Sequence, residues 1–346
     1  SWGDYDNDED LDLFVANANF DGENNFLYEN NGDGTFTKIT AGEIVNDGGN
    51  SSAASWGDYD NDGDMDVFVG ASSGSHKLMR NNGNGTFTDV TSGAGVSTAP
   101  TGHENVSYDF DNDGFLDIAC NGTIMYGKGD LTFEDIDNAQ LSYANGSFGD
   151  LNNDGFIDAY YNETIYWNNT TPNNWITINT VGTVSNIHGI GARVEIHTDS
   201  GTQIRDVRSG EGFKYMSTLN THFGLGSQTS INNITIYWPS GIIDIVENPT
   251  INTSVVVVEG ETLGLDDTLT DNLIIYPNPT KDFLNNSLPA ENLENAIYTI
   301  FDITGKRVSN AKLDASTLDV SYLNAGNYIL RIISGNSIKT QKFIKQ

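Results

Sequence analysis

Short apolar runs organise the first half of the chain. Four runs of β-type residues recur along it, each placed directly after a cluster of aspartates, and a further short run precedes each cluster. Runs of this length favour strands, and Asp/Asn/Gly clusters between them favour turns. The pattern therefore predicts an all-β region in which each acidic loop joins two strands. The runs that follow the loops are 11–15, 65–69, 116–119 and 157–161.

The acidic loops share one arrangement of side chains, seen most completely in residues 58–66. Aspartate stands at the first, third, fifth and ninth places, and glycine at the sixth. Oxygens at such regular spacing suit Ca²⁺, which takes six to eight oxygen ligands in flexible geometry. The first half of the loop matches the opening of an EF-hand loop. The closing carboxylate comes at place nine instead of place twelve, so no EF-hand helix is predicted.

The loop occurs four times, beginning at residues 4, 58, 109 and 150. The spacings of 54, 51 and 41 residues between these starts point to a propeller, solenoid or array. Asn-Gly and Asp-Gly turns at 30–36 and 81–87, with a looser copy at 125–133, predict β-hairpins because such turns need positive φ. Four short strands per repeat correspond to the blade of a β-propeller.

These loops and the Asn-Gly-Asp-Gly-Thr-Phe hairpin at 31–36 resemble FG-GAP/VCBS repeats, as found in integrin α propellers and cartilage acidic proteins. The resemblance implies Ca²⁺ bound by side-chain oxygens at places one, three, five and nine and by a backbone carbonyl at place seven. Carried over, it implies up to four calcium sites. Their residues would be Asp4, Asp6, Asp8, Asp10 and Asp12; Asp58, Asp60, Asp62, Asp64 and Asp66; Asp109, Asp111, Asp113, Phe115 and Asp117; and Asp150, Asn152, Asp154, Phe156 and Asp158.

Two copies depart from this pattern. Glu9 stands where the first loop should have glycine, and a non-glycine residue at positive φ is disfavoured. Asn152 removes one charge from the fourth loop, which predicts weaker binding there. One copy could be only a turn, but four in register between apolar runs favour a metal. A closed shell of carboxylates favours a structural role for that metal.

Family propellers usually have seven blades, so we expect further blades upstream of Ser1, because an open arc would expose strand edges.

The aspartate period stops after about residue 170, and residues 171–262 show the period-two alternation of a small β-sandwich. Motifs at 189–194, 208–212, 222–226 and 238–241 resemble the ASPIC/UnbV domain that follows such repeats in cartilage acidic proteins. Cations gather here in an otherwise acidic chain, and we expect them to pair with acidic neighbours across the propeller interface. The alternative is a site for an anion or acidic glycan. The cations are Arg193, Arg205, Arg208 and Lys214. We expect His222 to be structural.

An acidic, weakly patterned linker at 263–272 precedes the last domain, residues 273–346. Short β-type runs and turns predict a small Ig-like sandwich there. Tyr276-Pro277-Asn278-Pro279 and the segments 301–306, 323–328 and 342–346 resemble a type A sorting domain of the type IX secretion system. The resemblance implies a Bacteroidota-type protein that engages the secretion machinery through this tail. It also implies a location outside the cell or on the outer-membrane surface.

Composition excludes some classes of function. The net charge of −32 repels phosphate backbones, so nucleic acid is not expected as a partner. No run of about 18 apolar residues occurs, so no membrane span is predicted. The single cysteine, Cys120, lies in an apolar run and is expected to be buried.

The sequence therefore predicts a secreted or surface-held calcium-binding β-propeller, followed by two β-sandwich domains. We expect it to bind a glycan or protein ligand, as in adhesion, and to catalyse no reaction, because no nucleophile–base–acid pattern is visible. The alternative is an extracellular enzyme, polysaccharide-active or redox, with its active site in blades outside this chain.

Overall fold

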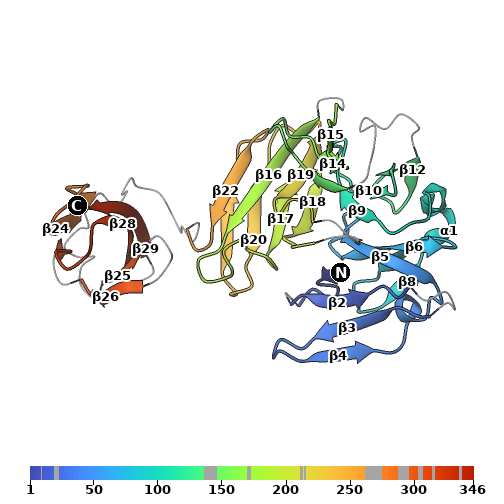
Figure 1. Ribbon diagram of the computed structural model, residues 1–346, viewed down its shortest axis with the longest axis horizontal. Coiled ribbons are helices and arrows are strands. Elements are labelled where there is room, and N and C mark those ends of the chain that lie inside the picture. Colours follow the sequence, from blue (N-terminus) through green and yellow to red (C-terminus); the bar gives the residue numbers. More distant parts are fainter. Residues whose placement is uncertain are drawn as a thin grey trace. The chain divides into compact units, whose positions relative to one another are not determined.

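The computed structural model describes residues 1–8, 10–18, 23–135, 146–169, 173–210, 213, 216–261, 275–286, 296–302, 307–313, 316–334 and 337–346. Glu9, Lys214 and the predicted linker 263–272 lie outside the described residues. The chain divides into two compact units, Ser1–Gly260 and Glu261–Gln346. In the described part, strands dominate both units (Figure 1), which confirms the all-β prediction.

Each acidic repeat forms its own antiparallel sheet, in which strands adjacent in sequence are neighbours. The first sheet is β1 (Trp2–Gly3), β2 (Asp12–Val15), β3 (Phe26–Asn30) and β4 (Phe36–Ile39). The second is β5 (Asn50–Gly57), β6 (Asp66–Ser73), β7 (Lys77–Asn81) and β8 (Phe87–Asp89). The third is β9 (Asn105–Tyr108), β10 (Asp117–Cys120), β11 (Thr123–Gly127) and β12 (Phe133–Asp135). The described strands of the fourth are β13 (Ser147–Gly149), β14 (Asp158–Tyr161) and β15 (Thr164–Tyr166). Short helical turns lie at η1 (Glu43–Val45), α1 (Thr91–Ala94) and η2 (Val96–Thr98).

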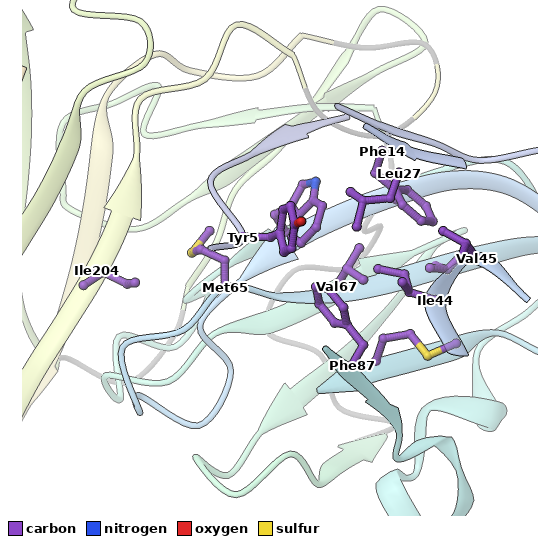
Figure 2. Close-up of a cluster of buried hydrophobic side chains, with 13 residues drawn as sticks. Tyr5, Phe14, Leu27, Ile44, Val45, Met65, Val67, Phe87 and Ile204 are labelled. Carbon is purple, nitrogen blue, oxygen red and sulfur yellow. The ribbon is translucent and has the colours of Figure 1, made fainter. Parts of the chain in front are cut away.

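Successive sheets pack face to face through apolar cores, as the blades of a propeller do. Between the first two sheets, Phe14 meets the fully buried Trp56 edge-on, with ring centroids 6.2 Å apart. Figure 2 shows this core, to which Ile204 of the following domain also contributes. A second core around Phe68 and Ile118 joins the second and third sheets, and a third core joins the third sheet to the fourth.

Residues 174–258 form a two-sheet sandwich. One sheet has the order β19-β16-β22, and β16 and β22 are parallel. The other has the order β18-β17-β20-β21. A shared core that includes Trp238 lies between the sheets. The strands are β16 (Asn174–Val181), β17 (Arg193–Thr198), β18 (Gly201–Asp206), β19 (Thr221–Gly226), β20 (Asn233–Tyr237), β21 (Ile243–Glu247) and β22 (Ser254–Val258).

The repeats and this sandwich, predicted as separate domains 1–170 and 171–262, pack into the single unit that ends at Gly260. Loops of the repeats contact β17 and β19 directly, as described below. The sandwich is therefore part of the surroundings of the acidic loops.

The second unit has its own core, which includes Leu284, Ile300 and Phe343. Its sheets have the orders β23-β24-β27 and β26-β25-β28-β29. The strands are β23 (Ile275–Tyr276), β24 (Phe283–Asn286), β25 (Ile297–Asp302), β26 (Arg307–Lys312), β27 (Thr317–Asp319), β28 (Gly326–Ser334) and β29 (Ser337–Lys345). Among the described residues, no helix is both long and apolar enough to cross a membrane.

Candidate metal centre

The aspartate at place one of each loop folds the loop around itself. The Asp109 carboxylate accepts hydrogen bonds from the backbone N–H of Asp113 (3.0 Å) and Gly114 (2.8 Å), and Asp58 and Asp150 accept the equivalent pairs. Gly114 adopts φ 101°, which explains why place six is glycine. Local backbone donors therefore position the first carboxylate before any metal is considered.

Place four has a conformational role that the sequence interpretation missed. An asparagine stands there in every loop, and each adopts left-handed φ between 55° and 60°. Asparagine tolerates this region better than other side chains. Its recurrence at one place of four loops was the available signal. The residues are Asn7, Asn61, Asn112 and Asn153.

The aspartate at place nine joins two backbone segments. Both oxygens of the fully buried Asp117 accept hydrogen bonds, from Phe110 N–H (2.8 Å) in the loop and from Gly127 N–H (2.9 Å) on β11. Asp12, Asp66 and Asp158 are equally buried and make the equivalent pair of bonds. In the first three repeats this carboxylate holds the loop to the third strand of its sheet, and in the fourth it holds the loop to Asn168, just after β15.

At place seven, the predicted contribution is a backbone carbonyl. The N–H groups of these residues donate to the place-five carboxylates over 2.8–3.0 Å, which fixes the backbone here. The residues are Asp10, Asp64, Phe115 and Phe156. That their carbonyls bind a metal stays a prediction.

Among the described residues, carboxylates of three loops converge closely enough to hold one ion. In each group the ligand atoms lie within 4.8 Å of one another. The groups are Asp4, Asp6 and Asp8; Asp58, Asp60 and Asp62; and Asp109, Asp111 and Asp117. The third group contains the place-nine aspartate and leaves out Asp113 at place five. The first two groups contain place five and leave out the place-nine residues Asp12 and Asp66.

The fourth loop differs, because no such carboxylate group forms among its described residues. The Asn152 side-chain amide donates a hydrogen bond to the Asp154 carboxylate over 2.8 Å. This carboxylate therefore has a protein donor within its own loop. The prediction that this site is the weaker one rests on this substitution.

The electrostatics of the loops call for a cation. Burial, offset by hydrogen bonds and reinforced by neighbouring carboxylates, raises the pKa of Asp12 and of Asp58 to about 7. Burial and then repulsion from Asp111 raise the pKa of Asp113 to about 6. Burial and then neighbouring aspartates raise the pKa values of Asp109 and Asp117 well above the ordinary value. A nearby positive charge favours the ionised form of carboxylates in such surroundings.

Buried oxygens without hydrogen-bond partners test directly whether the loop residues fit a metal ion. Oδ1 of Asp6 and Oδ1 of Asp60, both at place three, are buried and have no hydrogen-bond partner. Such atoms are costly unless satisfied by a donor or a cation. A hard divalent ion that takes oxygen ligands fits these residues.

Protein cations already lie beside the loops: the buried Arg205 of β18 favours the ionised forms of Asp58 and Asp109, and two further arginines pair with the first and second loops. Arg80 on β7 lies 3.2 Å from the Asp62 carboxylate and 3.6 Å from that of Asp60. Arg193 on β17 lies 3.2 Å from the Asp4 carboxylate, which agrees with the expected pairing across the interface. Arg208 instead donates to the Trp56 carbonyl over 3.1 Å.

His222 on β19 contacts the third loop. Its Nε2 donates to Asn112 Oδ1 (2.6 Å), and its Nδ1 lies 3.0 Å from the Thr177 hydroxyl. Burial, followed by repulsion from Arg205, lowers the pKa of His222 to about 3, so the ring is neutral. The residue joins the sandwich to the loop, in line with the structural role predicted for it.

Comparison with known families agrees with this architecture. Residues 4–69 and 58–120 match the family described as FG-GAP-like repeat, and residues 182–264 match ASPIC and UnbV. Residues 274–346 match the secretion system C-terminal sorting domain. The chain is therefore an FG-GAP-repeat protein with an ASPIC/UnbV domain and a sorting tail, exported to the cell surface or the extracellular space.

Among curated proteins, the chain is similar to cartilage acidic protein 1 of Xenopus tropicalis, with 26% identity over 67% of this chain, and of Homo sapiens, with 27% over 66%. It spans about 40% of the length of these relatives. Among solved structures, PorZ, a surface component of the type IX secretion system of Porphyromonas gingivalis, is 12% identical. That match covers 97% of this chain and 58% of PorZ with a TM-score of 0.29, too low to establish a shared fold.

Proposed function

We propose that this chain is a calcium-stabilised extracellular module that binds a glycan or protein ligand, as in adhesion, and that it is not an enzyme. The observation that carries the calcium part is the convergence of carboxylates within 4.8 Å in three loops, with buried, unpartnered oxygens at place three in two of them. Calcium would supply the positive charge and the coordination that these oxygens lack.

The residues that would hold the ion are the place-one, place-three and place-five aspartates, with place nine added in the third loop. Each loop connects the first two strands of its sheet. A bound ion would therefore fix the hairpin that carries the buried residues of the blade, such as Phe14 on β2 and Val67 on β6. Its role would be structural, because the surrounding groups are held by backbone donors and offer no reactive partner.

Binding is favoured over catalysis by the state of the titratable groups elsewhere in the described residues. Burial raises the pKa of the Cys120 thiol to about 12, so it is not a nucleophile. Burial lowers the pKa of His76, whose Nδ1 accepts from Ala71 N–H over 3.0 Å. The Glu259 carboxylate accepts hydrogen bonds from the backbone N–H groups of residues 183–185. These bonds favour a structural role for this carboxylate over acid–base catalysis.

Thermal unfolding of the full chain tests the calcium part. Calcium should raise the melting temperature, and a chelator should lower it, because an ion that binds only the folded state stabilises it by about 2.7 kcal/mol at a hundredfold excess over Kd. Asp62→Ala should reduce this response, and Asp319→Ala, an exposed position in the second unit, should not. Coincident scans with and without chelator would contradict the proposal.

A glycan array probed with the full-length protein in calcium tests the ligand part. The proposal predicts retention of a defined class of glycans, or of a surface protein in a parallel pull-down, that is lost when calcium is removed. Release of shortened products from a polysaccharide would instead support the enzyme alternative.

A further inference from the structure

The third loop is the most deeply buried of the four acidic loops. Its place-four residue, Asn112, is fully buried, whereas Asn7 and Asn153 at the same place are exposed. At place five, Asp113 is half-buried, and the aspartates of the other three loops are exposed to solvent. The four loops share one local arrangement, so the difference arises from what packs against each of them.

Strand β19 of the sandwich covers the third loop. The Gly226 N–H donates to the Asn112 carbonyl over 2.7 Å, and His222 Nε2 donates to Asn112 Oδ1 over 2.6 Å. Just before β16, the Asn173 side chain donates to the Asp111 carbonyl over 2.9 Å. The sandwich therefore holds the loop at places three and four. All three donors are uncharged, because the His222 ring is neutral.

Gly224 makes this close packing possible. A side-chain carbon at this position of β19 would collide with Asp109 Oδ2 and with the backbone of Asn112. Asp109 is the place-one carboxylate of the third group of converging ligands. A glycine within a strand marks such a close approach of another part of the chain. It brings the backbone of the sandwich directly against a predicted metal ligand.

The other two loops with converging carboxylates are covered differently. The sandwich contacts the first loop through the charged Arg193, which pairs with Asp4. In the second loop, Oδ1 of Asn61 is buried and has no hydrogen-bond partner, and Arg80 lies beside the place-five carboxylate. Among the described residues, no cation forms a salt bridge with a third-loop carboxylate, and Arg205 acts on this loop only from a longer distance.

We propose that the third loop is the calcium site from which the ion dissociates most slowly, because β19 closes it. The inference rests on the proposed calcium binding and assigns a distinct exchange rate to one site. An ion held by buried carboxylates under a packed strand leaves only when that strand opens locally. In the first and second loops, solvent reaches place five without such opening. Gly224 is then a positioning residue, and the sandwich is part of the site.

Stopped-flow release of calcium from the loaded full chain into an excess of a chelating dye tests the inference. Asp111→Asn and Asp60→Asn each remove one ligand charge, from the third and the second loop, and so assign the kinetic phases. Gly224→Ala pushes β19 away from the loop, and His222→Ala removes one bond of the cover without adding volume. His222→Gln keeps a donor, and Ile236→Ala weakens the core of the sandwich instead.

We expect one ion to leave at least about tenfold more slowly than the others, and Gly224→Ala and His222→Ala each to accelerate it about tenfold, the effect of one lost hydrogen bond. The slow phase should be absent in Asp111→Asn and present in Asp60→Asn. His222→Gln and Ile236→Ala should retain it. If Gly224→Ala does not fold, the comparison of His222→Ala with His222→Gln decides the outcome.

Release of all bound ions at a single rate would overturn the inference and leave the proposed function standing. A slow phase that disappears in Asp60→Asn and persists in Asp111→Asn would overturn the assignment to the third loop. Equal acceleration by Ile236→Ala and Gly224→Ala would show that general stability, and not closure by β19, sets the rate. A full chain that binds no calcium would contradict the proposed function and the inference together.

Discussion

The Arg193 guanidinium lies 3.2 Å from the Asp4 carboxylate, although 189 residues separate them. The same guanidinium contacts the Asp206 carboxylate over 3.1 Å, and the three side chains are largely buried. The sandwich therefore supplies a positive charge to the first acidic loop. This contact is one of several that join the repeats to the sandwich within one unit.

Replacing Arg193 with Met should strongly destabilise the unit Ser1–Gly260. Removal of one partner from a buried ion pair leaves two carboxylates without their counter-charge, and such changes cost about 3–5 kcal/mol. Denaturant unfolding measures the change in free energy. Lys128→Met breaks an ion pair with Glu134 that is about half exposed on both sides and should have little effect. Equal effects of the two variants would show that the Arg193 contact is not stabilising.

Without calcium, stability should fall as the pH rises. The pKa of Asp12 and of Asp58 is about 7 and that of Asp113 about 6 in the folded chain, against 3.8 for a free side chain, mainly because of burial. The folded state then holds more protons than the unfolded state, so the stabilisation is complete below about pH 4 and is lost through pH 6 to 7.

Calcium should reverse this trend, because metal binding displaces protons from its carboxylate ligands. His222 acts in the opposite direction, since its lowered pKa of about 3 costs stability as the pH falls below 6.5. Three aspartates have a raised pKa against this one histidine, so the carboxylates set the direction of the change in stability. Unfolding free energies measured from about pH 4 to pH 8, with chelator and with calcium, should therefore cross. Parallel curves would mean that the carboxylates do not titrate with folding.

Places three and nine should respond differently to the same substitution. Asp66→Asn places an amide donor against one of two backbone N–H groups, which should cost about 1–3 kcal/mol with or without calcium, because Asp66 lies outside the converging carboxylates of its loop. Asp60→Asn changes a carboxylate whose Oδ1 has no protein partner and whose Oδ2 forms only a half-exposed pair with Arg80 at 3.6 Å, so most of its cost should arise only when calcium is present. Unfolding of both variants in chelator separates the roles. A large cost of Asp60→Asn in chelator would refute the distinction.

Arg80 should weaken calcium binding at the second loop. Its guanidinium lies 3.2 Å from Asp62, whereas the aligned residue in the first repeat is Glu29, which approaches Tyr5 instead. Arg80→Gln removes a competing charge that is 44% exposed, so we expect calcium affinity to rise about two- to fivefold. Calorimetric titration measures this. Lys38→Gln, a charge change elsewhere in the repeats, is the control, and a drop in affinity for Arg80→Gln would contradict competition.

The local features of the loops could be predicted from the sequence, because the ligand spacing and the turn residues lie within nine consecutive residues and the strand runs lie directly beside them. The hydrogen bond that links Asp117 to β11 depends on strand pairing and could not be predicted from the sequence. The contact of Asn112 with His222 joins residues 110 apart, so the expected pairing of charges across the interface could not show which loop residues meet the sandwich. The unpartnered Asn61 Oδ1 emerges only once its neighbours are placed.

Crystals grown in calcium, with anomalous difference maps recorded at long wavelength, test the central claim most directly. The account predicts peaks about 2.3–2.6 Å from the carboxylate oxygens of Asp4 and Asp6, of Asp58 and Asp60, and of Asp109 and Asp111. Ordered waters about 2.7–3.0 Å from these oxygens in every loop, with no anomalous signal, would contradict it.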